Sequence, residues 1–66
     1  MIKLSIGLIG KRLRVVCTDG SVFEGLCFGY DQSFNNEPPM DSISVETDSR
    51  CYELFIDEIA SVEKLD

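Results

Sequence analysis

The chain has 66 residues, with twelve acidic and six basic side chains and a formal net charge of −6 at pH 7. This length suits a single domain, residues 1–66. Its core would be small, so oligomerisation would help to stabilise it. Three cysteines without a histidine exclude a full set of disulfide pairs and a Cys/His zinc site, and the acidic balance argues against loose, non-specific phosphate binding.

The first nine residues are mostly apolar and permit two interpretations. Their apolar residues alternate with a period of two, as in a strand, whereas Ser5, Leu8 and Ile9 suit a short helical turn. We expect a turn or strand that caps the domain. Basic residues bracket this segment and no small-residue cleavage site follows, so it does not resemble a signal peptide. Since no apolar stretch is long enough to span a bilayer, we expect a cytoplasmic protein without membrane contact.

Residues 12–18 alternate between polar and apolar side chains, which predicts a strand that buries one face. Its inward residues would be Leu13, Val15 and Cys17. The dipeptide Asp19-Gly20 follows and tolerates positive φ at both positions. It therefore predicts a tight two-residue hairpin turn.

The next apolar segment, residues 22–30, is interrupted by Gly25 and Gly29. Glycine within a strand marks a bulge, a bend or the close approach of another backbone. This spacing predicts one long, strongly bent strand. Leu26 and Phe28 would lie on its outer face, so either the strand is covered on both sides or these two residues form a contact surface.

Residues 31–39 contain the Asn, Asp, Ser and Pro residues typical of turns. Proline cannot donate to a ladder, so the next strand cannot begin before about Met40. It would extend over residues 40–47, with a second hairpin turn at residues 47–50.

Two further strands, 51–56 and 59–65, flank a short break at Asp57-Glu58. The first would place Tyr52, Leu54 and Ile56 on one face. Five short, strongly bent antiparallel strands in so short a chain predict an all-β small barrel with at most a short N-terminal helical turn.

Charge is unevenly distributed along the chain. The first 14 residues carry four of the six bases and no acid, and the remainder carries all twelve acids. Such an asymmetry can indicate a nucleic-acid surface. It can equally indicate a subunit whose basic edge contacts the acidic edge of its neighbour.

Catalytic, metal and cofactor chemistry has little support in the sequence. There is no histidine, and no acid–base pair has an informative spacing. The cysteines are interpreted as small buried residues in a reducing compartment. The adjacent carboxylates Asp57 and Glu58 are interpreted as a hydrated turn, because Ca²⁺ requires six or more oxygen ligands. We expect neither an enzyme nor a bound cofactor or metal.

One set of residues resembles a known family. The order Gly20, Phe23, Gly25, Cys27, Gly29-Tyr30-Asp31 and Asn35 is similar to the first motif of Sm and Sm-like (LSm) proteins. The segment LFIDEIASVEKL occupies the place of the second motif, so the resemblance covers Ile9 to Leu65. The segment NEPPMDSI is most similar to small bacterial Sm-like proteins of undefined role.

The resemblance implies a five-stranded barrel whose fourth strand pairs with the fifth strand of the next copy, in a homo-oligomeric ring of six or seven subunits. These edges would be Cys51–Ile56 and Ile59–Leu65. Closing a ring would pair edge strands that are otherwise exposed. The implied interface residues are Cys51, Tyr52, Glu53, Leu54, Phe55, Ile59, Ser61 and Val62.

The resemblance also implies an RNA-binding pocket, in which Asn35 reads a base and Asp31 orients the loop. The family's base-stacking position is Ser33 here, and its arginine position is Asp57. The alternative is a structural role, in which Asp31 and Asn35 satisfy backbone groups in the turn. The expected function is a ring-forming scaffold that binds RNA or a protein. The alternative is a protein-interaction module of the same fold without RNA binding.

Overall fold

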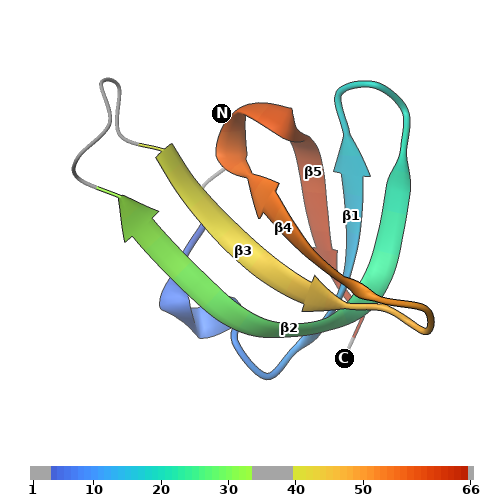
Figure 1. Cartoon of the computed structure of the whole chain (residues 1–66), viewed down its shortest axis with the longest axis horizontal. Coiled ribbons are helices and arrows are strands. Elements are labelled where there is room, and N and C mark those ends of the chain that lie inside the picture. Colours follow the sequence, from blue (N-terminus) through green and yellow to red (C-terminus); the bar gives the residue numbers. More distant parts are fainter. Residues whose placement is uncertain (1–3, 34–39, 66) are drawn as a thin grey trace.

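The computed structural model describes residues 4–33 and 40–65, with only the backbone described at Ser33. These residues form five antiparallel strands and two short 3-10 turns (Figure 1). The elements are η1 (Ile6–Leu8), β1 (Arg12–Cys17), β2 (Val22–Ser33), β3 (Met40–Glu46), β4 (Cys51–Phe55), η2 (Ile56–Glu58) and β5 (Ile59–Lys64). The predicted all-β chain with a short N-terminal turn is confirmed.

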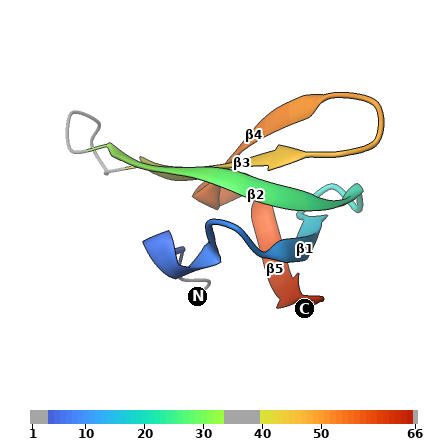
Figure 2. The same cartoon turned by 90° about the horizontal axis from the view of Figure 1, so that it is seen from below.

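All five strands belong to one sheet, in the order β4-β3-β2-β1-β5. β2 pairs with β1 along its first half and with β3 along its second half, and it bends as it passes from one to the other (Figures 1 and 2). The two halves of the sheet consequently face different directions. No ladder joins β4 to β5 among the described residues, so the sheet is open rather than closed by hydrogen bonds.

The two interior glycines of β2 lie where the prediction requires them. A Cβ atom on Gly25 would overlap the backbone of Glu46 in β3, with the carbonyl carbon only 2.7 Å away. Just beyond this close approach, the register of β2 against β3 shifts between Cys27 and Gly29, which is the mark of a β-bulge. The expected long, bent strand is therefore confirmed.

The turn between β1 and β2 differs from its prediction. The Cys17 amide donates to the Ser21 carbonyl at 2.8 Å, and the Gly20 amide donates to the Cys17 carbonyl at 3.0 Å. Three residues thus form the loop, so the predicted two-residue turn is wrong. Gly20 alone has positive φ (93°), because Asp19 keeps negative φ and its carboxylate accepts the Ser21 amide at 2.9 Å. That hydrogen bond also lowers the pKa of Asp19.

The core occupies the concave side of the bent sheet. Its fully buried side chains come from β1, β2 and β3, and they include the inward residues that alternation predicts for β1. η1 lies beneath β2, on the same side as β1 and β5 (Figure 2), and adds Leu8 to this core, as does Leu4 just before it. Of the two N-terminal interpretations, the helical turn is correct for Ile6–Leu8. Ile2 lies outside the described residues.

The connection from β4 to β5 also differs in detail. Ile56 was expected to end a strand, but β4 ends at Phe55 and Ile56 begins η2, where the Ile59 amide donates to the Ile56 carbonyl. The predicted break at Asp57-Glu58 is the remainder of this 3-10 turn. The Thr18 amide donates to the Glu58 carbonyl at 2.8 Å, which joins η2 to the end of β1.

Candidate functional site

The outer edge of β4, which pairs only with β3 among the described residues, is the first candidate site. Backbone groups of an antiparallel strand alternate between the neighbouring strand and the opposite side. The Thr47 amide donates to the Arg50 carbonyl at 2.9 Å, which fixes the phase of this alternation. Counting from that pair along the β3–β4 register shows that the backbone N–H and C=O groups of Cys51, Glu53 and Phe55 point away from β3. These donors and acceptors are available to another strand.

β5 lies at the other end of the sheet, and within residues 4–33 and 40–65 its only strand partner is β1. The Leu65 amide donates to the Arg12 carbonyl at 2.8 Å. Counting from that pair along the β1–β5 register shows that the backbone N–H and C=O groups of Val62 and Lys64 point away from β1. The register also shifts opposite Val16 and Cys17, so β5 contains a bulge near its start. The straight part of this edge is consequently its second half.

The predicted interface residues all lie on β4 and β5, but they do not have equal exposure. Leu54 and Ile59 are 4% and 5% exposed and belong to the core of their own subunit. The half-buried residues are Tyr52, Phe55 and Val62, and the exposed ones are Cys51, Glu53 and Ser61. The backbone edge and these six side chains therefore form the surface that another copy could contact.

The two ends of the sheet differ in charge. Near β5, the Arg14 side chain donates to Glu24 at 2.6 Å and to Glu63 at 3.3 Å, and the hydrogen bond to Glu24 contributes most to raising the pKa of Arg14. At the β4 end, the Ser42 hydroxyl donates to Glu53 at 2.9 Å and the Tyr30 hydroxyl donates to Asp41 at 3.2 Å. Glu53 and Asp41 at this end thus accept hydrogen bonds from neutral hydroxyl groups.

The residues of the predicted nucleotide pocket are only partly described. Asp31 is exposed on β2 opposite Ser42 of β3, and Asp57 is exposed in η2. The Ser33 side chain and the whole of Asn35 lie outside the described residues. The base-binding arrangement therefore stays a prediction.

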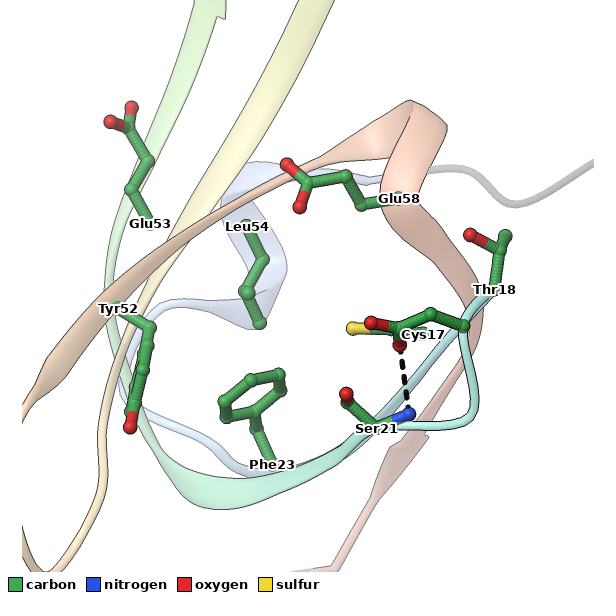
Figure 3. A pocket seen from close by; sticks show the side chains of 9 residues that line it. Cys17, Thr18, Ser21, Phe23, Tyr52, Glu53, Leu54 and Glu58 are labelled. Carbon is green, nitrogen blue, oxygen red and sulfur yellow. Dashed lines mark hydrogen bonds between the residues drawn. The ribbon is translucent and has the colours of Figure 1, made fainter.

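A pocket of about 330 Å³ opens between the β1–β2 turn, β4 and η2 (Figure 3). Phe23 and Tyr52 form one side of it, with ring centroids 4.5 Å apart and an interplanar angle of 52°. No sequence signal could have found this site, because the sheet brings together residues that are distant along the chain. Its lining consists of Cys17, Thr18, Asp19, Ser21, Phe23, Tyr52, Glu53, Leu54 and Glu58.

The three cysteines are free thiols in two environments. Cys17 and Cys27 are buried, as their inward positions predict, but Cys51 is exposed on β4, so the interpretation of all three cysteines as buried residues is wrong for Cys51. Burial raises the pKa of both buried thiols above the ordinary value of 9.0, and the charges of Asp19 and Glu58 raise that of Cys17 further. Neither buried thiol has the lowered pKa of a nucleophilic cysteine.

These raised pKa values predict a loss of stability in alkaline solution. The folded chain holds the two thiol protons more tightly than the unfolded chain, so their contribution is complete below pH 9 and disappears as the pH rises through the folded pKa values. Urea unfolding at pH 7, 9 and 10 measures this decline. The Cys27→Ala variant should show a shallower decline, and Cys51→Ser should leave it unchanged. Equal slopes in all three proteins would contradict the prediction.

Searches against family models, curated proteins and solved structures find no match to this chain. In the part of the chain that the structure describes, no helix is long and apolar enough to cross a membrane. Within the same residues, no three Cys, Asp or Glu side chains gather in a way that could hold a metal ion.

Proposed function

We propose that this chain is an Sm-like scaffold, a small five-stranded barrel whose copies join head to tail into a ring. In each joint, β4 of one copy pairs with β5 of the next. The observation that carries the proposal is the pair of unpaired edges at opposite ends of one bent sheet. An exposed edge readily pairs with another strand, and a heterologous contact that repeats with the right rotation closes a ring.

Charge and core size support this direction of assembly. The two strands at the β5 end, β1 and β5, carry Arg12, Arg14 and Lys64 against one acid, Glu63, whereas β3 and β4 at the other end carry the three acids Asp41, Glu46 and Glu53 and no base. A head-to-tail joint brings these unlike ends together, whereas a β4–β4 contact would bring like charges together. Each joint also adds backbone hydrogen bonds to a domain whose core is small.

The outer face of β2 supports a protein as the partner of this scaffold. Leu26 is 38% exposed and Phe28 is 51% exposed, so of the two expectations for these residues the contact surface is favoured. Arg14 on the neighbouring strand is engaged by two carboxylates and is not a free phosphate ligand. RNA, which the resemblance implies, is the alternative that the test below distinguishes.

The mass in solution tests the ring. Light scattering behind a sizing column, at micromolar protein and moderate salt, should give six or seven times the 7.4 kDa of one chain. A monomer or a dimer at this concentration would reject the proposal. Absorbance at 260 nm recorded across the same peak, before and after nuclease treatment, separates the partners. Excess absorbance at 260 nm that nuclease treatment removes indicates bound RNA. A peak without such excess absorbance supports the protein partner.

A further inference from the structure

The pocket between the β1–β2 turn, β4 and η2 has a composition that neither the core nor the edge strands require. Phe23 of β2 and Tyr52 of β4 are both half-buried, and Figure 3 shows the Phe23 ring and the Leu54 side chain turned into the pocket. The rings touch each other, so a ligand would lie against their pocket-facing surface rather than between them. Aromatic faces attract cations, most strongly where water is excluded.

The Glu58 carboxylate is the second element of the pocket. It projects from η2 toward the opening in Figure 3, and no described residue forms a hydrogen bond or ion pair with this side chain. The Glu58 backbone is held by the Thr18 amide at 2.8 Å, so the position from which the carboxylate projects is fixed. An unpaired carboxylate beside an aromatic wall favours a cationic ligand.

The rest of the lining excludes an anion. Asp19 adds a second carboxylate, whereas the Glu53 side chain lies at the rim and turns away from the pocket in Figure 3, and the described lining includes neither lysine nor arginine. Their charges are partly satisfied, because Asp19 accepts the Ser21 amide and Glu53 accepts the Ser42 hydroxyl. The local potential is therefore negative, and Glu58 is the carboxylate with capacity for a new partner.

The floor of the pocket determines which kind of cation fits. Leu54 and Cys17 are 4% and 7% exposed and provide an apolar floor, and a volume of about 330 Å³ lies at the small end of the range for ligand sites. A hydrated metal ion would gain nothing from this floor or from the aromatic rings. An ammonium group on a short aliphatic stem matches both parts.

We infer that this pocket binds an alkylammonium group, with the ammonium at Glu58 and the ring faces of Phe23 and Tyr52, and the stem on the apolar floor at Leu54. A free small amine and a lysine side chain carry the same group, and both are included in the test. All nine lining residues belong to one subunit, and two of them, Tyr52 and Glu53, also lie on the proposed β4 joint.

Carbon-13 NMR of the aromatic side chains tests the inference with n-butylammonium chloride as the probe, at low salt. Its binding should shift the Phe23 and Tyr52 signals and leave Phe28 in place, with an affinity at least about fivefold above that of the neutral analogue 1-butanol. The lysine analogue N-acetyl-lysine methylamide is titrated in parallel. Tighter binding of this analogue assigns the site to peptide lysines, and tighter binding of butylammonium assigns it to free amines.

Two matched pairs of variants locate the site. Glu58→Gln should weaken butylammonium binding about threefold or more, whereas Glu63→Gln on β5 removes a carboxylate outside the pocket and should have no effect. Phe23→Leu should weaken binding similarly, and Phe28→Leu should not. Equal binding of butylammonium and 1-butanol would overturn the inference. So would equal effects within either pair of variants, or the absence of any aromatic shift in the folded protein.

Discussion

Replacing Gly25 by alanine is expected to destabilise the domain by about 3 kcal/mol, which would unfold a substantial fraction of so small a protein. The new methyl group would overlap the carbonyl group of Glu46, and that group belongs to the backbone of β3. A flexible side chain could rotate away, but a strand held in a ladder can move only if its hydrogen bonds lengthen. Because β2 bends beside this point, the substitution would force β2 and β3 apart where the sheet turns. Far-UV circular dichroism and urea unfolding measure the loss.

Two other glycines provide controls for this result. A Cβ atom on Gly29 would meet the Ser44 side chain at 3.3 Å, so Gly29→Ala should cost less than Gly25→Ala. A Cβ atom on Gly7 would meet only Ser5 Oγ, at 3.6 Å, and Gly7→Ala should be close to neutral. The order of the three costs is the prediction. If Gly25→Ala were as stable as Gly7→Ala, β2 and β3 could not approach as closely as the structure has them.

The order of the three glycine costs is also a test of how far the sequence predicts this fold. Strands that bury one face were predictable because burial selects alternate residues, as Leu13 and Val15 in β1 and Ile43 and Val45 in β3 illustrate. The bend of β2 was predictable because only glycine allows another backbone so close. These features depend on the residue types themselves, so they can be recognised without coordinates.

The features that sequence reasoning missed depend on contacts between distant segments. The β1–β2 loop has three residues because Asp19 caps the Ser21 amide and leaves positive φ to Gly20 alone. Ile56 continues the apolar alternation of β4, yet it begins η2, and the chain there is bonded to Thr18 at the end of β1. The local sequence pattern does not reveal either of these hydrogen bonds.

The candidate sites divide in the same way. The strands 51–56 and 59–65 could be predicted from their apolar residues, and the resemblance to Sm-like proteins implied that they form the edges of the sheet. The sequence could not predict which backbone groups of these strands face outward, because the alternation is set by the Thr47–Arg50 and Arg12–Leu65 hydrogen bonds. The pocket had no sequence signal at all, because β1, β2, β4 and η2 each contribute only a few residues to it.

A proline on the β4 edge is expected to abolish the proposed ring while leaving the subunit folded. The amide of Glu53 points away from β3, so Glu53→Pro removes a donor that the subunit does not use internally. The proline ring would also project toward the neighbouring β5 and hold the two strands apart. Since a joint has few ladder hydrogen bonds, each worth about 1 kcal/mol net, losing two or three should shift the assembly to monomers. Light scattering should then give the 7.4 kDa of one chain.

Glu53→Ala is the matched control, because it removes the same carboxylate from the Ser42 hydroxyl but keeps the backbone amide. It should remain a ring, so that a difference between the two variants isolates the amide from the side chain. Should Glu53→Pro lose its β-sheet circular dichroism, the pair Lys64→Pro and Lys64→Ala repeats the comparison on the β5 edge, where the Lys64 amide also points outward. If both proline variants were folded and kept the full mass of the ring, β4 and β5 would not form the joint. The copies would then have to meet through another surface, for which the exposed face of Leu26 and Phe28 on β2 is an apolar candidate.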